Sequence, residues 1–173
     1  AQTLAETQGL HRIPSFDPDL VSGVASYGLE LLKSQPGIVR VYVPIGLGSG
    51  ICGMICARNT LGLDTEIVGV VSSAADCYAR SLDSGEYITT ESADTLADGM
   101  AVRVPSREAL DLMRDNVARI VRVDDEEVLA AMSIYFSDTH NIAEGAGAAP
   151  LAALIKEQET NLGKQVAVVL SGG

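Results

Sequence analysis

The sequence predicts an α/β protein of three layers, in which helices cover both faces of a mainly parallel sheet. Apolar, strand-like segments alternate with segments of helical periodicity along the 173 residues. The strand candidate at residues 65–71 is apolar without interruption, which is typical of a strand buried on both faces. The length suits one domain, residues 1–173. A hydrophobic fraction of 47% with only 4% aromatic residues indicates an aliphatic core.

The first part of the chain contains a capped helix ahead of the first main strand. Residues 1–8 look like the end of a helix that a glycine stops, and residues 10–13 are a short strand candidate. Asp17 suits a helix N-cap with Pro18 at the first helical position. Residues 35–37, Gln-Pro-Gly, end that helix.

The later elements alternate in the same way. We expect Ser72-Ser73 and Ser106 to open helices as capping residues. The acidic run 124–127 suits a first helical turn because the helix dipole favours negative charge there. Residues 83–104 are polar and show no clear period. The expected elements are strand 38–43, helix 51–61, strand 65–71, helix 74–82, helix 107–115, strand 118–123, helix 125–137, helix 148–159 and strand 165–170.

The charge balance excludes two classes of partner. Lys and Arg number 12 against 23 Asp and Glu, a net charge of −11. Such a chain repels nucleic acid and anionic membrane surfaces, so neither is an expected partner. Any bound phosphate must therefore be held mainly by backbone amides.

The three cysteines indicate a reducing compartment, and hence the cytoplasm. Cys52, Cys56 and Cys77 are odd in number, form no Cys-x-x-Cys motif and lie in apolar or helical surroundings. No histidine lies near them, so we expect buried thiols rather than a metal site. The sequence shows no signal peptide and no transmembrane run. Because it starts at Ala1 and stops directly after a strand, we expect it to be part of a longer polypeptide.

A glycine-rich loop is the first candidate for a binding site. Residues 46–50, Gly-Leu-Gly-Ser-Gly, connect a β-branched strand to an apolar helix. A helix N-terminus presents unpaired N–H groups and a favourable dipole to an anion, and glycine lets a ligand approach the main chain. The loop is neither a Walker motif nor a complete dinucleotide fingerprint. The alternative interpretation is a tight βα turn without a ligand.

Small residues also follow other predicted strands. Gly46–Ser49, Ser72-Ser73 and Ser171-Gly172-Gly173 each lie at a predicted carboxyl end. Ligands of parallel α/β sheets bind at this edge. The convergence of small-residue loops there favours a phosphorylated ligand.

Short sequence blocks along most of the chain resemble one known family. The blocks are Pro18-Asp19-Leu20-Val21-Ser22-Gly23, Val43-Pro44-Ile45-Gly46-Leu47-Gly48-Ser49-Gly50, Ala74-Ala75-Asp76-Cys77-Tyr78, Ala97-Asp98-Gly99, Glu144-Gly145-Ala146-Gly147-Ala148 and Val168-Val169-Leu170-Ser171-Gly172-Gly173. In this order they resemble the fold type II (tryptophan synthase beta-like) pyridoxal-phosphate enzymes. The threonine/serine dehydratase (ammonia-lyase) branch is the most similar, with serine racemase nearby.

The resemblance implies a set of cofactor contacts for pyridoxal 5'-phosphate. Gly46, Leu47, Gly48 and Ser49 match the family's tetraglycine loop, whose amides hold the phosphate, with Leu47 and Ser49 in place of two glycines. That exchange is tolerable if the N–H groups of both residues still point inward with a negative φ. Ser171 matches the serine that bonds to the pyridine nitrogen, where a neutral hydroxyl suits β-elimination better than transamination.

Two further positions are less settled. Glu144 matches a family glutamate near the ring, and its alternative role is to cap the following helix. The family's divalent-cation site matches Asp76 and the Ala74 carbonyl, but its glutamate ligand aligns with Val70. Because a hard cation requires several oxygen donors, we expect a weak metal site or none, with Asp76 on a helix surface. Where the family often has Gly-Gln-Gly-Thr, this chain has Gly23-Val24-Ala25-Ser26, so the substrate is open.

No lysine of this chain suits catalysis. The family's Schiff-base lysine lies in an upstream half with a Ser-x-Lys-x-Arg motif, and Lys33, Lys156 and Lys164 lack that context. The resemblance implies a homo-oligomeric lyase, packed against its own N-terminal half, that converts L-threonine or L-serine to a 2-oxo acid and ammonia. Alternatives are a serine racemase-like or threonine synthase-like enzyme, or a non-catalytic phosphate- or nucleotide-binding module.

Overall fold

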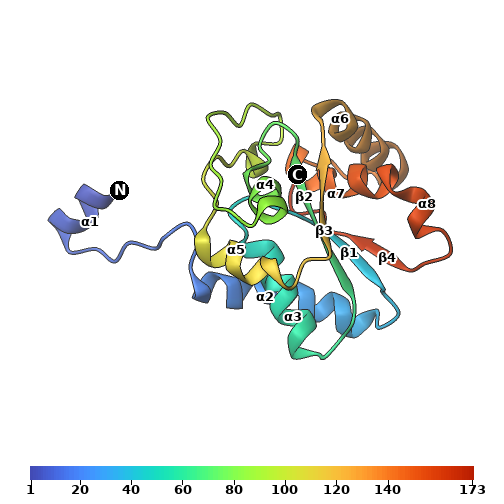
Figure 1. Ribbon diagram of the computed structural model, residues 1–173, viewed down its shortest axis with the longest axis horizontal. Coiled ribbons are helices and arrows are strands. Elements are labelled where there is room, and N and C mark those ends of the chain that lie inside the picture. Colours follow the sequence, from blue (N-terminus) through green and yellow to red (C-terminus); the bar gives the residue numbers. More distant parts are fainter.

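The protein is built on a four-stranded parallel sheet with strand order β3-β2-β1-β4. The computed structural model describes all residues 1–173 (Figure 1). The strands are β1 (Arg40–Pro44), β2 (Glu66–Ser72), β3 (Arg119–Val123) and β4 (Val166–Val168). In the register, Val41 of β1 lies beside Ile67 of β2 and Ala167 of β4. The predicted parallel sheet is therefore confirmed, with β1 and β2 at its centre.

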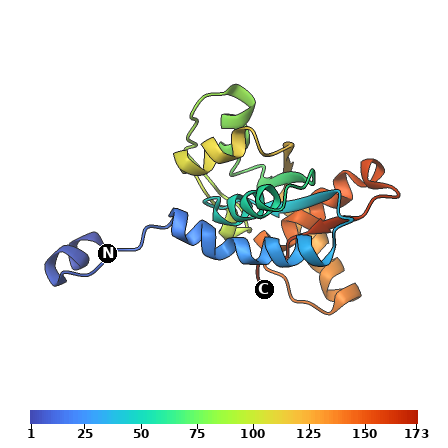
Figure 2. The same cartoon turned by 90° about the horizontal axis from the view of Figure 1, so that it is seen from below.

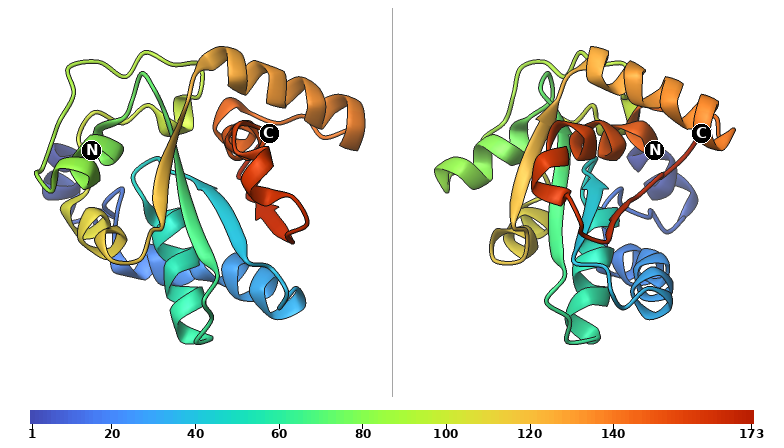
Figure 3. Two further views of the ribbon diagram at one scale, coloured as in Figure 1. Left: turned by 45° about the vertical axis from the view of Figure 1, so that its right-hand side comes forward. Right: turned by 90° about the vertical axis from the view of Figure 1, so that its right-hand side faces the viewer.

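Helices enclose the sheet in the expected three layers. Around the sheet lie α2 (Pro18–Ser34), α3 (Ser49–Thr60), α4 (Cys77–Ser84), η1 (Asp98–Met100), α5 (Arg107–Arg114), α6 (Asp125–Ile134), η2 (Tyr135–Thr139), α7 (Gly145–Lys156) and α8 (Gln158–Asn161). Helices α2, α3 and α5 cover one face, and α6 and α7 cover the other (Figures 1 and 3).

Each face of the sheet has its own hydrophobic core. Along β1, Val41 and Val43 point into the core beneath α2, α3 and α5, whereas Tyr42 points into the core beneath α6 and α7. Alternate residues of a strand face opposite sides. This explains why the predicted strands are apolar without interruption: both faces of β1 and β2 are buried.

Several capping predictions are confirmed. Asp17 accepts a hydrogen bond from the Asp19 N–H at 2.8 Å, with proline at the first helical position of α2. Ser106 caps α5. The acidic run forms a capping box at the start of α6, in which Asp124 and Glu127 each bond to the other's backbone N–H.

Other predicted elements differ. Residues 10–13 form no strand: with α1 (Gln2–Gln8) they extend away from the body of the protein (Figures 1 and 2) and find no neighbouring strand to pair with. Helix α4 begins at Cys77, because the Ser72 hydroxyl accepts the Ala74 N–H in a turn instead of capping a helix. The final strand is short and half-buried because it lies at the sheet edge, and the helix expected at 148–159 starts at Gly145.

A network of charged side chains fastens the amino-terminal edge of the sheet. Arg40 bonds to Glu66 at 2.6 Å and to Asn161 at 2.6 Å, which joins β1, β2 and α8. Glu157, at the end of α7, accepts hydrogen bonds from Arg119 of β3 at 2.8 Å and from the Tyr42 hydroxyl at 2.7 Å. The network therefore ties the α7–α8 corner to three strands.

We expect this network to make stability depend on acidity. Hydrogen bonds from Arg119 lower the pKa of Glu157 below its ordinary value. Stability from this carboxylate is thus present above the unfolded-state pKa of about 4.3 and is lost as the pH falls through the lower folded pKa. Glu157→Gln should lower the free energy of unfolding at pH 7 by about 1–3 kcal/mol and flatten its decline below pH 4. Urea unfolding between pH 3 and pH 7 measures both effects.

Glu159→Gln is the matched control, because Glu159 is exposed and lies in the same corner. It should leave stability within about 0.5 kcal/mol at every pH. Equal effects of the two substitutions would contradict the assigned role of Glu157.

Candidate functional site

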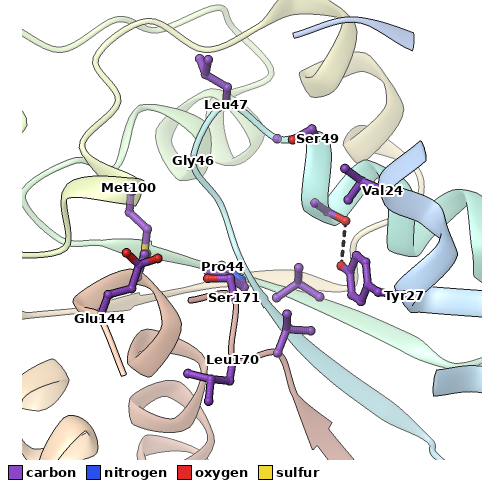
Figure 4. Close-up of a pocket in the computed structure, with 16 residues that line it drawn as sticks. Val24, Tyr27, Pro44, Gly46, Leu47, Ser49, Met100, Glu144, Leu170 and Ser171 are labelled. Atoms are coloured by element: carbon purple, nitrogen blue, oxygen red, sulfur yellow. Dashed lines mark hydrogen bonds between the residues drawn. The ribbon is translucent and has the colours of Figure 1, made fainter. Parts of the chain in front are cut away.

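A pocket of about 510 Å³ opens at the carboxyl ends of β1 and β4 (Figure 4). This volume lies in the range of small-molecule sites, and the carboxyl edge is where parallel sheets bind ligands. The pocket wall is formed by Val24, Tyr27, Val43, Pro44, Gly46, Leu47, Gly48, Ser49, Gly50, Gly99, Met100, Glu144, Ala146, Val169, Leu170 and Ser171. All the residues that the sequence predicts as cofactor contacts lie on this one wall. Their role as contacts stays a prediction.

The glycine-rich loop keeps glycine where the backbone requires it. Gly48 has a φ of +103°, a conformation that side-chain-bearing residues rarely adopt. A Cβ on Gly46 would overlap the carbonyl oxygen of Gly99, so the close approach of loop and η1 requires glycine there too. Neither Leu47 nor Ser49 has a positive φ. The backbone part of the condition for replacing two glycines of a tetraglycine loop is therefore met, and the inward direction of the two N–H groups stays a prediction.

The loop presents backbone donors that the protein itself does not use. The N–H groups of residues 46–50 have no acceptor within the chain, and no side chain caps α3. They coincide with the positive end of the α3 dipole, which attracts anions. No Lys or Arg lines the pocket. An anionic group here would thus be held by amides, and this donor set fits a phosphate.

Glu144 and Ser171 lie on the wall of the same pocket (Figure 4). Glu144 precedes α7, and its backbone N–H bonds to the Gly172 carbonyl at 3.1 Å. Glu144 occupies the N-cap position of α7, but its side chain makes no capping hydrogen bond, so the carboxylate is not used as a helix cap. A Cβ on Gly172 would lie 2.8 Å from the carboxylate, which explains the glycine at that position. The exposed side chain of Ser171 leaves its hydroxyl free to meet a ligand.

Sequence reasoning missed part of the wall. Val24 and Tyr27 of α2 both line the pocket, and neither was named as a binding residue from the sequence. The Tyr27 hydroxyl donates to the Gly50 carbonyl at 2.8 Å (Figure 4). Met100 comes from a segment with no readable period. From the sequence, only the family-like block Ala97-Asp98-Gly99 indicated that the segment containing Met100 lies near a binding site.

Other candidates lie elsewhere. Ser72-Ser73 does not reach the pocket, because Ser72 forms a turn and the Ser73 N–H bonds to Val123. Asp76 pairs with Arg122 at 3.1 Å, and no cluster of metal-ligating side chains exists in the protein. Lys156 bonds to Glu127 at 2.8 Å, away from the pocket.

The fold and the pocket define an α/β protein with a pocket at the carboxyl edge of its sheet, whose wall includes unpaired loop amides. The sequence profile of the family described as pyridoxal-phosphate dependent enzyme matches residues 1–172. The chain therefore belongs to the family of pyridoxal-phosphate dependent enzymes, as the sequence blocks predicted.

Relatives narrow the similarity further. The chain is 36% identical to an L-threonine ammonia-lyase of Geobacter sulfurreducens, covering 99% of this chain and 43% of that protein. It is 30% identical to a beta-hydroxyaspartate dehydratase of Paracoccus denitrificans, covering 100% of this chain and 55% of the relative. The chain thus spans about half, or less, of the length of these curated relatives.

Solved structures share this fold. The processed form of threonine deaminase isoform 2 from Solanum lycopersicum superimposes with a TM-score of 0.93 at 28% identity, covering 99% of this chain and 51% of that one. Maize serine racemase superimposes with a TM-score of 0.89 at 28% identity, over 99% of this chain and 54% of that one. The expected fold type II architecture is confirmed.

Gly48 should tolerate a side chain poorly. Its φ of +103° is strained for alanine, and the added Cβ would lie 2.8 Å from Ala109 and 2.9 Å from Met113. Gly48→Ala should therefore lower the free energy of unfolding by about 1–3 kcal/mol and weaken phosphate-ligand binding. Thermal unfolding and ligand titration measure the two effects.

Gly23→Ala is the control for the general effect of replacing glycine. Gly23 lies within α2 with a negative φ and open space around it. Alanine there should raise stability by up to about 1 kcal/mol. A Gly48→Ala protein as stable as the Gly23→Ala protein would contradict the loop geometry.

Proposed function

We propose that this chain forms the cofactor-binding part of a pyridoxal-phosphate-dependent ammonia-lyase, which dehydrates and deaminates L-threonine or L-serine. The carrying observation is the pocket itself, where unpaired loop amides and a neutral serine hydroxyl lie on the same wall. The L-threonine ammonia-lyase among its relatives supports the reaction class. The products would be a 2-oxo acid and ammonia.

Each part of the pocket has a role in this proposal. The amides of residues 46–49 bind the cofactor phosphate, and the Ser171 hydroxyl meets the pyridine nitrogen. Glu144 lies beside the ring, and the apolar side chains of Val24 and Met100 keep water from it. When bound, pyridoxal phosphate supplies an electron sink for the charge left at the α-carbon of the amino acid. A neutral hydroxyl at the ring nitrogen keeps that sink moderate, which suits elimination.

The setting of the protein is part of the same proposal. We place it in the cytoplasm as a homo-oligomer, with the catalytic lysine in a segment that packs against this one. Burial raises the pKa of the Cys52 thiol to about 12 and the pKa of the Cys77 thiol to about 11, so both stay protonated and unreactive, which suits a reducing compartment. None of the helices is long and apolar enough to cross a bilayer.

The reaction is tested on the intact gene product. With added pyridoxal phosphate and L-threonine, we expect 2-oxobutanoate and ammonia in equal amounts. The absence of both products would reject the lyase assignment. Formation of D-serine from L-serine without 2-oxo acid would instead indicate the racemase alternative, which the maize structure makes worth including.

A second measurement separates an enzyme from a non-catalytic phosphate-binding module. Borohydride treatment of the native protein should attach the cofactor covalently to one lysine, and mass spectrometry should place that lysine outside residues 1–173. Release of unmodified cofactor with no lysine adduct would favour the module.

A negative charge introduced at the start of α3 should raise the stability of the protein and lower its affinity for the cofactor. Ser49→Asp places a carboxylate at the first helical residue, where the dipole stabilises it by about 0.3–1 kcal/mol. The same carboxylate repels the cofactor phosphate, so affinity for pyridoxal phosphate should fall at least about tenfold. Ser49→Asn is the neutral control of equal size. Fluorescence titration and thermal unfolding report the two effects, and equal affinities of the two variants would contradict a phosphate at this loop.

A further inference from the structure

A tyrosine behind the glycine-rich loop holds one of its carbonyl groups. The Tyr78 hydroxyl, from α4, donates to the Leu47 carbonyl at 2.7 Å. Tyr78 is 1% exposed and does not line the pocket. Tyr27 holds the Gly50 carbonyl in a similar way, but it lines the pocket and would itself touch a ligand. Tyr78 therefore acts on the loop only from behind.

The Tyr78 hydroxyl can donate its proton to only one acceptor, the Leu47 carbonyl. The backbone N–H of Ser106 donates to the Tyr78 oxygen at 2.8 Å. An amide N–H has no acceptor capacity, so the hydroxyl must direct its single proton toward the Leu47 carbonyl. Burial raises the pKa of Tyr78, so the hydroxyl keeps that proton throughout the neutral range. The chain of donors runs from the N-cap of α5, through Tyr78, to the loop.

Fixing the Leu47 carbonyl also fixes a donor on the opposite side. In a planar trans peptide, the carbonyl of one residue and the N–H of the next point in opposite directions. Because the Leu47 carbonyl faces Tyr78, the Gly48 N–H faces away from it. Atoms of Ala109, Met113 and Tyr78 fill the space behind Gly48, whereas the pocket lies in front. The Gly48 N–H therefore faces the pocket.

Without this hydrogen bond, the peptide group between Leu47 and Gly48 can adopt an alternative orientation, turned by about half a rotation. Glycine adopts positive and negative φ with similar ease, so Gly48 does not itself prevent the peptide from turning over. A turned peptide would present the Leu47 carbonyl oxygen to the pocket in place of an N–H. The loop would then repel an anion that it now attracts.

We propose that Tyr78 is a positioning residue for the phosphate site, whose hydroxyl fixes the peptide between Leu47 and Gly48 so that an N–H faces the ligand. This inference rests on the proposed function. It adds a residue outside the pocket whose loss changes selectivity for a phosphorylated ligand.

Tyr78→Phe in the full chain tests the inference. The readout is the ratio of two affinities, for pyridoxal phosphate and for pyridoxal, which lacks the phosphate. We expect the variant to bind pyridoxal phosphate about tenfold more weakly, the factor typical of one lost hydrogen bond. Its affinity for pyridoxal should stay within about twofold. If Tyr78 had only a structural role, its loss would weaken the binding of both ligands by the same factor.

Two control variants remove comparable bonds at neighbouring positions. The Tyr87 hydroxyl donates to the Pro105 carbonyl at 2.8 Å, next to Ser106, so Tyr87→Phe deletes a similar tyrosine bond. Ser106→Ala removes the α5 cap and keeps the N–H that directs Tyr78. Both should retain the wild-type ratio of the two affinities.

The outcomes separate this inference from the proposed function. A wild-type protein that binds both ligands equally would overturn the phosphate site and the role of Tyr78 with it. A preference for pyridoxal phosphate that Tyr78→Phe leaves intact would overturn only the role of Tyr78. That role is also overturned if the variant weakens the binding of both ligands by the same factor.

Hydrogen exchange on the wild-type chain gives a test that needs no variant to fold. Inorganic phosphate at the loop should hold the Leu47–Gly48 peptide in place and strengthen the bond chain to Ser106. The Ser106 amide should then exchange several-fold more slowly when phosphate is present. An unchanged Ser106 rate, at a phosphate concentration that protects the Gly48 amide, would contradict the coupling.

Discussion

The unpaired backbone donors where β1 passes into α3 are the constraint around which the rest of the structure is arranged. Leaving several adjacent N–H groups unpaired in a protein interior would cost free energy. These groups must therefore face a space that a ligand or water fills. Both hydrophobic cores hold β1 in place, and Gly46 lies directly against the Gly99 carbonyl. On the other side, Gly53 lets α2 approach α3 until a Cβ would lie 3.0 Å from the Ala25 nitrogen. The loop is thus fixed from several directions while its amides stay open.

The two ends of the sheet have different chemistry: one carries ion pairs that stabilise the fold, and the other carries the pocket. At the amino-terminal edge, buried Arg40 of β1 pairs with Glu66 of β2, and Arg119 of β3 pairs with Glu157 at the α7–α8 corner. At the carboxyl-terminal edge, charged side chains are nearly absent, and Glu144 is the one acidic residue on the pocket wall. A net charge of −11 is compatible with the proposed phosphate site, because screening limits exposed charges to a range of about 8 Å. The unpaired loop amides are therefore the groups expected to attract an anion at this edge.

The elements that sequence reasoning placed correctly are those governed by local chemistry. The N-cap at Asp17, the acidic first turn of α6 and the doubly buried strands each follow from a few adjacent side chains. The failures concern elements that depend on distant partners. Residues 10–13 have strand-like composition but no neighbouring strand, and the start of α7 depends on Gly147 packing against the Gly172 carbonyl. Tyr27 and Tyr78 could be read as core residues, but nothing local reveals that their hydroxyls reach loop carbonyls.

By itself, the sequence determined the layered α/β architecture, and it predicted a phosphate site made of loop amides together with a set of cofactor contacts. The architecture follows from hydrophobic periodicity, and the amide-held phosphate is predicted from glycine chemistry and from a charge balance that leaves no basic cluster. The cofactor contacts are what the resemblance to the family implies. Only the tertiary structure decided that Gly46–Ser49, Glu144 and Ser171 share one pocket, and that Tyr78 stands behind its loop. The physical reason is that a pocket is made where strands and helices distant in sequence meet, and their packing, rather than any local pattern, sets which atoms face one another.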